Sequence, residues 1–247
     1  MSSGKSSRRK FLKDAAVTGA AFTIVPRYVL GGPGYTAPSD TLNIAGIGVG
    51  GQGRGNLQRM ASENIVALAD VDWNRAKDTF KDYPKAERFK DYRKMLNEVK
   101  DIDAVMIATP DHIHAGAGLM AMGMDKHVYI EKPLAHNIAE VRALTEMALS
   151  KPNLVTQMGN QGASGEGIRQ TQEIYEAGLL GDVHTVYAWT NRPIWPQGGQ
   201  TPSEKQEIPK TLDWNLWLGP AEWREYNAAY LPFAWRGFWD FGTGALG

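Results

Sequence analysis

Between residues 41 and 160, short apolar runs alternate with longer stretches in which apolar residues recur every three or four positions. The short runs are typical of buried strands, and the longer stretches are typical of amphipathic helices. Strands that alternate with helices of this length predict βαβ units and a parallel sheet. The expected strands are 43–48, 65–69, 87–89, 104–108, 127–130 and 154–158, and the expected helices are 54–62, 73–82, 92–99, 115–123 and 139–150.

The pattern changes at about residue 160. A helix is predicted over 168–177, and an alternation of apolar and polar residues over 183–190 predicts a half-buried strand. Seven of the eight tryptophans then lie between residues 189 and 239, among many prolines and glycines. These differences predict a domain boundary near residue 160, with domains over 41–160 and 161–247.

The first forty residues differ from the rest in charge. They hold six of the 27 Lys and Arg residues but two of the 27 Asp and Glu residues. The stretch 7–13, SRRKFLK, closely resembles the twin-arginine export motif. The apolar stretch 15–26 is shorter than the roughly 20 residues that span a bilayer. Residues 1–40 are therefore interpreted as a signal and linker, with a disordered basic tail as the alternative.

Composition limits the possible chemistry and partners. The chain has no cysteine, which excludes disulfides, thiolate nucleophiles and cysteine metal sites. Beyond residue 40 the chain is slightly acidic and has no basic run. Nucleic acid is therefore not an expected partner.

A glycine-rich turn follows the first predicted strand and precedes a predicted helix. Such turns let the backbone approach a dinucleotide diphosphate at a helix N-terminus, although a glycine turn without a ligand is a real alternative. Asp70 ends the second strand, where a carboxylate bonds the adenosine ribose and repels a 2′-phosphate, which favours NAD over NADP. Asp72 is interpreted as a helix cap. The predicted cofactor ligands are Gly48, Gly50, Gly51, Gln52, Gly53 and Asp70.

Two further motifs lie just past strand ends, where open α/β sheets place ligands. In 109–114, TPDHIH, two histidines without a supporting carboxylate cluster do not indicate a metal site, and helix capping by Asp111 or loop packing is the alternative interpretation. Glu131-Lys132-Pro133 follows the fifth strand. Lys132 can donate a hydrogen bond to a substrate oxygen there, whereas as a lone triplet it would form surface salt bridges.

These motifs, in this order, resemble the Gfo/Idh/MocA oxidoreductase family. The resemblance is carried by ALADVD (67–72), DAVMIATPDHIHA (103–115) and KHVYIEKPLA (126–135), while QMGNQG (157–162), LDWNLWLGPA (212–221) and WRGFWDFGTGALG (235–247) are similar to an exported bacterial branch.

The resemblance implies an α/β fold. A Rossmann domain is followed by an α+β domain with a mainly antiparallel sheet, and hydride transfer occurs at a secondary alcohol. In that family a segment like 242–247 is followed by an Asp and then a His, so this chain is expected to be part of a longer protein.

The resemblance also implies roles for individual residues. Gly51 and Gln52 approach the pyrophosphate, Glu131 contacts the nicotinamide ribose, and Lys132 is the catalytic residue that faces the substrate. The residues implied to lie beside the nicotinamide half or near the cofactor are Thr109, Pro110, His112, His114 and Asn160.

The tryptophan-rich region suits a carbohydrate or polyol, because aromatic faces stack on sugar rings. Trp195, Trp235, Arg192 and Arg236 are the candidate substrate residues, although such aromatics more often fill cores or subunit interfaces.

The leading functional hypothesis is a periplasmic oxidoreductase that keeps its NAD bound and forms homo-oligomers when full length. Its translocation partner is the twin-arginine machinery. An NAD-dependent glycosidase with a redox-neutral cycle and a non-catalytic sugar-binding protein are the alternatives.

Overall fold

The computed structural model describes residues 37, 40–160, 162–193, 195–198 and 200–244. The chain divides into two compact units, Met1–Thr41 and Leu42–Gly247, and everything below concerns the second. The predicted twin-arginine motif lies outside the described residues. No helix within the described ranges is long and apolar enough to cross a membrane.

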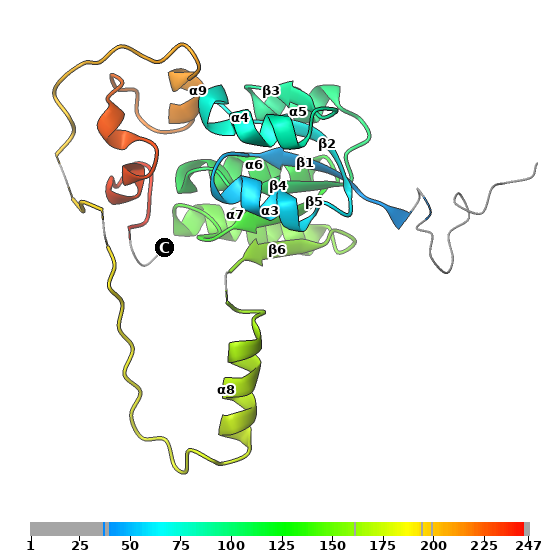
Figure 1. Cartoon of the computed structure of the whole chain (residues 1–247), viewed down its shortest axis with the longest axis vertical. Coiled ribbons are helices and arrows are strands. Elements are labelled where there is room, and N and C mark those ends of the chain that lie inside the picture. The colour runs from blue at the N-terminus through cyan, green and yellow to red at the C-terminus, as the bar shows by residue number, and fades with distance from the viewer. Residues whose placement is uncertain (1–36, 38–39, 161, 194, 199, 245–247) are drawn as a thin grey trace, which may run out of the picture. The chain divides into compact units, whose positions relative to one another are not determined.

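A six-stranded parallel sheet forms the centre of the second unit (Figure 1). Its order, β3-β2-β1-β4-β5-β6, places β1 and β4 side by side at the point where the order reverses. The predicted doubly wound Rossmann fold is therefore confirmed. The strands are β1 (Asn43–Ile47), β2 (Asn64–Ala69), β3 (Glu87–Phe89), β4 (Ala104–Ile107), β5 (His127–Glu131) and β6 (Thr156–Gly159).

Helices cover both faces of this sheet. Alternate residues of a strand point to opposite faces, so the buried strands present apolar side chains on both sides. Ile44 and Met106 pack with Leu57 and Phe80 on the face covered by α3 and α4. Their chain neighbours belong to the core under α5, α6 and α7. The helices are α3 (Gln52–Arg59), α4 (Trp73–Asp82), α5 (Tyr92–Glu98), α6 (Asp111–Gly123) and α7 (Ile138–Ser150).

One helix begins earlier than the sequence pattern predicts. The expected helix starts at Ala115, whereas α6 starts at Asp111, immediately after Pro110. Proline has a backbone angle suited to a helix start, and a carboxylate in the first turn interacts favourably with the helix dipole. His112 and His114 consequently lie in a helix rather than in a loop.

The described residues from 162 onward contain helices but no strand. The expected strand over 183–190 and the expected antiparallel sheet are therefore not seen in this part of the chain. Residues 183–190 are exposed, and no neighbouring strand pairs with them, which a strand requires for stability. The elements here are α8 (Glu166–Glu176), α9 (Trp214–Leu218) and the 3₁₀ turns η2 (Ala228–Tyr230) and η3 (Ala234–Gly237).

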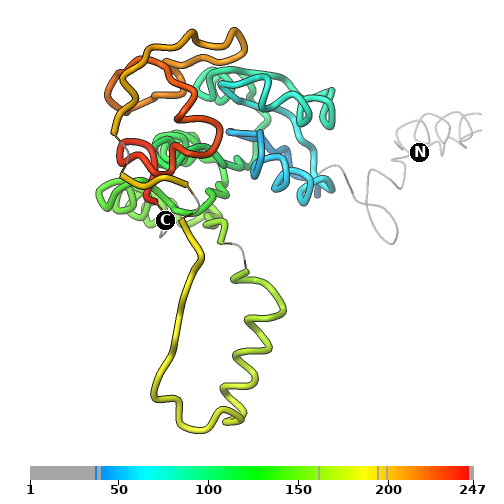
Figure 2. The backbone as a smooth tube through the Cα atoms, turned by 60° about the vertical axis from the view of Figure 1, so that its left-hand side comes forward, coloured from blue at the N-terminus to red at the C-terminus, as the bar shows by residue number. Residues whose placement is uncertain are grey.

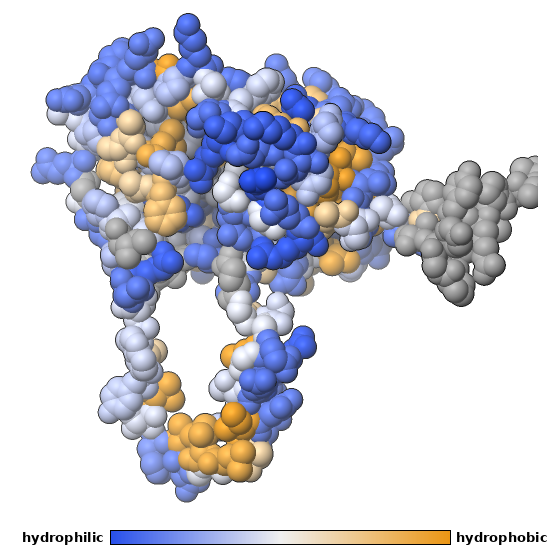
Figure 3. All heavy atoms as spheres, in the orientation of Figure 1, coloured by the Kyte–Doolittle hydropathy of each residue, from blue (hydrophilic) through white to orange (hydrophobic). Residues whose placement is uncertain are grey.

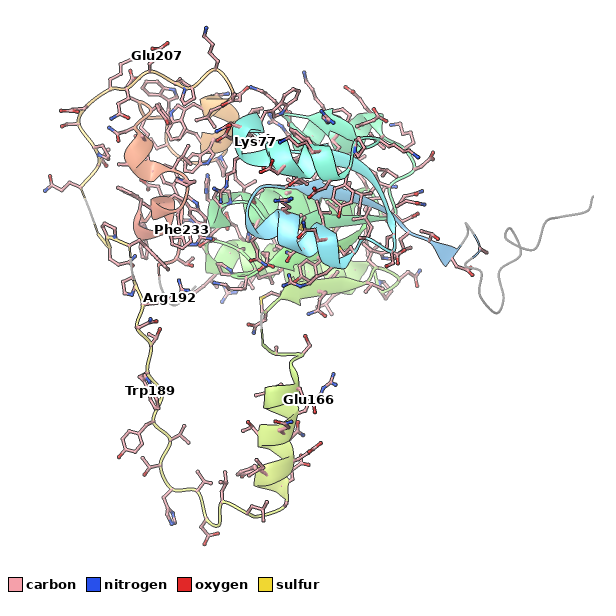
Figure 4. All side chains as sticks on the ribbon, in the orientation of Figure 1. Lys77, Glu166, Trp189, Arg192, Glu207 and Phe233 are labelled. Atoms are coloured by element: carbon pink, nitrogen blue, oxygen red, sulfur yellow. The ribbon has the colours of Figure 1, made fainter. Side chains whose placement is uncertain are left out.

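Helix α8 buries none of its residues. Apolar side chains gather in orange where α8 ends (Figure 3), and Ile174, Leu179 and Leu180 are exposed there. Trp189 is also exposed, in the segment that follows α8 (Figure 4).

An aromatic core holds the C-terminal segment, residues 212–241, together. Trp214 and Trp217 stack with their ring centroids 4.8 Å apart, and Tyr230 and Phe241 pack against them. In the backbone view (Figure 2) the segment, in orange and red, lies beside the α/β part of the chain. It is tied to the end of β2, because Asp213 N donates to Val71 O at 2.9 Å.

Candidate functional site

The glycine turn between β1 and α3 leaves no room for side chains. A Cβ at Gly53 would lie 1.9 Å from Gly48 O, and one at Gly48 would lie 2.7 Å from Ala108 O. Gly48 and Gly51 have positive φ angles of 74° and 55°, which favour glycine. The turn thus brings bare backbone to the N-terminus of α3, as binding of a diphosphate requires.

Asp70, at the end of β2, holds this turn in place. One oxygen, Oδ2, accepts hydrogen bonds from Val49 N at 2.9 Å and from Gly50 N at 3.1 Å. The other, Oδ1, accepts from Asp72 N at 2.9 Å. Asp70 therefore fixes the backbone of the turn in addition to facing the cavity described next. Asp72 caps α4 by accepting from Asn74 N and Arg75 N, which confirms its predicted role.

A cavity of about 500 Å³ lies at the carboxyl edge of the sheet, beside the glycine turn. This volume is within the range of small-molecule sites. One wall is the Rossmann sheet edge, and the other comes from residues 215–236 of the C-terminal segment. The cavity brings together the predicted site residues Gly48, Gly50, Gln52, Asp70, Thr109, Pro110, His112, Trp235 and Arg236.

Sequence reasoning predicted Trp235 and Arg236 of the C-terminal wall but missed the rest of it. Asn215, Leu216, Gly219 and Pro220 line the cavity, although the sequence suggested only a tryptophan-rich region here. Gly219 has a φ of 53°, and a Cβ there would lie 2.3 Å from Ile113 Cδ1. The adjacent Gly-Pro pair in LGPA was the available signal that the backbone turns tightly at this point.

His112 connects the two walls. It is 3% exposed, with Nε2 3.1 Å from Trp217 O and Nδ1 3.3 Å from Phe241 O. Burial lowers the pKa of His112 to about 4, so the ring is neutral at pH 7. Its neighbour Asp111 accepts from both the backbone N and Oγ1 of Thr243, each at 3.0 Å. The start of α6 therefore anchors the C-terminal segment.

His114 lies away from the cavity lining. Its ring is 1% exposed, with Nδ1 2.7 Å from Pro133 O and Nε2 2.9 Å from Thr109 O. It thereby joins the segments after β4 and β5. Among the described residues, no three His, Cys, Asp or Glu side chains are arranged to hold a metal ion.

A second set of predicted residues lies together at the ends of β5 and β6. Glu131 is 5% exposed and accepts from Asn56 Nδ2 at 2.8 Å, with Gln52 Nε2 at 3.5 Å. Lys132 is exposed, and its backbone N donates to Gly159 O at 3.2 Å, next to Asn160. Gln52 therefore links the cavity to the end of β5, where the predicted catalytic lysine lies.

Two predicted substrate residues lie outside the cavity lining. The Arg192 guanidinium is 5.6 Å from the Trp195 ring, and Trp195 packs edge-on against Phe233 at 5.1 Å. Figure 4 labels Arg192 in the segment that follows Trp189, and Phe233 in the C-terminal segment. Trp195 is 8% exposed, so it contributes mainly to packing.

The charge of Asp70 gives a testable pH dependence. Burial raises the pKa of Asp70 to about 6, while the amides of Asp72, Gly50 and Val49 oppose the rise. Because this pKa is above the usual 3.8, the group favours folding at low pH, and this contribution disappears as pH rises through 6. A ribose hydroxyl donates best to the ionised form. We therefore expect NADH affinity to fall as pH is lowered through about 6.

Fluorescence titration of NADH between pH 5 and pH 8 measures this effect. The Asp70→Asn variant cannot ionise at this position, so its NADH affinity is expected to be weaker and much less dependent on pH. An equal pH slope in the native protein and the variant would assign the titration to another group.

Cofactor chemistry fits these residues. The backbone cradle has no room for a Cβ, the helix N-terminus favours an anion, and the buried carboxyl at the end of β2 accepts hydroxyl donors. These three features suit a dinucleotide such as NAD.

Comparisons with known proteins support this assignment. Two family models match the chain: the NAD-binding Rossmann fold of the GFO_IDH_MocA oxidoreductase family over residues 42–158, and the C-terminal alpha/beta domain of the same family over 165–247.

The curated relatives include dehydrogenases of inositols. An inositol 2-dehydrogenase/D-chiro-inositol 3-dehydrogenase of Lacticaseibacillus casei is 28% identical over 198 residues, which cover 76% of this chain and 56% of that protein. An inositol 2-dehydrogenase of Salmonella typhimurium is 28% identical and covers 60% of this chain and 45% of that protein. The chain thus spans about half the length of these relatives.

A solved structure of myo-inositol dehydrogenase from Lactobacillus casei, in complex with NAD(H) and myo-inositol, matches with a TM-score of 0.52 and 28% identity. The match covers 57% of this chain and 43% of that protein. With the family models, the glycine turn and the strand order in agreement, the chain belongs to the Gfo/Idh/MocA oxidoreductase family and has its NAD-binding Rossmann fold.

Proposed function

We propose that this protein transfers a hydride between tightly bound NAD and a secondary alcohol of a sugar, glycoside or polyol. The observation that carries the proposal is the cavity at the sheet edge, which joins the glycine turn to Asp70 and connects through Gln52 to the end of β5. The inositol dehydrogenases among the relatives support a polyol or sugar as the substrate class.

Each site residue has a role that follows from its position in the fold. The turn at Gly48–Gly53 receives the diphosphate, and Asp70 orients the adenosine ribose. The buried Glu131 contacts the second ribose, held in place by its hydrogen bond from Asn56. When bound, NAD supplies a nicotinamide that accepts or returns the hydride. Lys132, one residue beyond Glu131, holds the substrate hydroxyl and moves its proton.

The test begins with the protein as purified. Mass spectrometry of the denatured protein is expected to detect NAD or NADH, and a panel of polyols, sugars and glycosides is expected to change the NADH absorbance. Release of an aglycone without net NADH change would assign the protein to the redox-neutral glycosidases instead. Absence of any nucleotide, together with no NADH binding, would reject enzymatic function in favour of simple sugar binding.

We also propose that the protein is exported already folded by the twin-arginine machinery. The support is the motif Arg8-Arg9 followed by Phe11-Leu12 and a short apolar stretch. A route for folded proteins lets the NAD enter before export, where the nucleotide is made. Replacing Arg8 and Arg9 with lysine is expected to keep the protein in the cytoplasmic fraction, whereas unchanged fractionation would exclude this route.

Homo-oligomerisation of the whole protein stays a prediction. Light scattering on the purified protein tests it, and a monomeric mass would contradict it.

A further inference from the structure

Two of the three arginines that line the cavity come from opposite walls. Arg75 belongs to α4 of the Rossmann domain, and Arg236 belongs to η3 in the C-terminal segment. None of the ion pairs among the described residues includes either one. Two cations without carboxylate partners at one cavity create a positive potential that attracts an anion.

Arg75 lies against the glycine turn. A Cβ at Gly50 would be 2.5 Å from Arg75 Cγ, and a Cβ at Gly51 would be 2.7 Å from Arg75 Nη2. The guanidinium group therefore lies directly beside Gly51, one residue before the N-terminus of α3. A charge at this point adds to the positive end of the helix dipole.

Arg236 is held by two aromatic rings. Its guanidinium carbon is 4.2 Å from the ring centroids of both Phe233 and Trp235. Burial is the main cause that lowers the pKa of Arg236, and repulsion from Arg75 and Arg192 adds to it. Asp111 opposes this shift, but one of its oxygens already accepts two hydrogen bonds from Thr243. The stacking fixes the charge in position without supplying a counter-ion.

The acidic residues of the cavity have other partners. Asp70 accepts hydrogen bonds from three backbone amides, Asp72 caps α4, and Asp91 forms an ion pair with Arg93 at 2.8 Å. Asp70 and Asp72 follow β2 and Asp91 follows β3, on the side of the turn where the proposed function places the adenosine. Lys90, the other basic residue of the lining, lies over the Trp73 ring at 6.0 Å, whereas Arg75 lies beside the turn itself.

We propose that Arg75 and Arg236 clamp the dinucleotide diphosphate from its two sides. This inference rests on the proposed function and assigns Arg236 to the cofactor rather than to the sugar. It also gives the C-terminal segment a role in retaining the nucleotide, because Arg236 reaches the cavity only when that segment is docked on His112 and Asp111.

Ligands with and without the diphosphate test the clamp. We compare ADP-ribose with adenosine, each displacing NADH from the nucleotide-stripped protein, in Arg75→Gln and Arg236→Gln variants. A charge-assisted contact to phosphate predicts that ADP-ribose binds about tenfold more weakly in each variant, while adenosine binding changes less than about twofold. Arg236→Lys is expected to restore part of the ADP-ribose affinity, because it keeps the charge.

Arg59→Gln is the matched control. Arg59 is exposed at the end of α3, lies outside the cavity lining and donates to Gly55 O of its own helix. Its replacement removes the same charge and is expected to leave both ligands unaffected.

Four results would overturn the clamp. Equal weakening of adenosine and ADP-ribose would show that the arginines only support the fold. Unchanged ADP-ribose binding with weaker binding of an anionic sugar such as glucuronate would assign them to the substrate. A native protein that binds neither NADH nor ADP-ribose would remove the proposed function as well, whereas normal native binding with unaffected variants would remove the clamp alone.

Discussion

Replacing Lys132 with methionine is expected to reduce turnover of a secondary alcohol by about 10²- to 10⁴-fold, the usual contribution of a positioned proton donor or acceptor. Lys132 directly follows β5, and its exposed side chain belongs to the same sheet edge as Glu131 and Asn160. Methionine has a similar length and removes only the ammonium group. NADH affinity is expected to stay within about twofold, because the proposed function assigns the lysine to the substrate rather than to the diphosphate or adenosine.

Steady-state kinetics and NADH titration on the same preparations measure this prediction. Lys77→Met is the control, because Lys77 is exposed on α4 (Figure 4) and lies outside the cavity lining. It is expected to keep native turnover. If Lys132→Met also keeps native turnover, another group transfers the proton, and if it loses NADH, its role is in cofactor binding.

Replacing Gly53 with alanine is expected to abolish NADH binding and to lower the free energy of unfolding by about 3 kcal/mol, as for a severe overpacking change. The added methyl carbon would lie 1.9 Å from Gly48 O, which is backbone and cannot rotate away. The turn would have to open, and its hydrogen bonds to Asp70 would be lost with it.

Gly55→Ala, two residues further along α3, is a matched control. The nearest atom to its added carbon would be Arg59 Nη1, at 3.8 Å, and alanine favours a helix more than glycine by up to about 1 kcal/mol. This variant is expected to bind NADH normally and to be equally or more stable in urea denaturation. A Gly53→Ala protein with native NADH affinity would show that the turn does not receive the diphosphate.

Local patterns in the sequence were sufficient for most of the Rossmann domain. The apolar runs that became β1 and β4 are buried on both faces, so their composition alone distinguishes them from surface strands. The glycine turn and Asp70 were also predictable, because their spacing relative to two strands reflects one continuous βαβ unit. The start of α6 was missed, since histidines after Thr-Pro resemble a loop until their tertiary contacts are known.

Contacts between distant segments were not predictable in the same way. The His112 ring contacts the carbonyl oxygen of Phe241, which is 129 positions away, and Asp111 accepts a hydrogen bond from Thr243 N. Neither partner carries a periodic pattern that indicates the other. The same holds for the tryptophans, of which Trp214 and Trp217 form a core while Trp189 and Trp223 stay exposed. Burial depends on neighbours in space, and the sequence pattern did not distinguish these residues.

The sequence by itself determined the α/β order, the glycine turn and the carboxylate that follows the second strand, because each depends on residues close together in the chain. The tertiary structure alone decided that residues 215–236 form the opposite wall of the cavity and that Arg236 faces Arg75 across it. The physical reason is that a site between two segments depends on long-range packing, here of an aromatic core against the end of β2 and the start of α6.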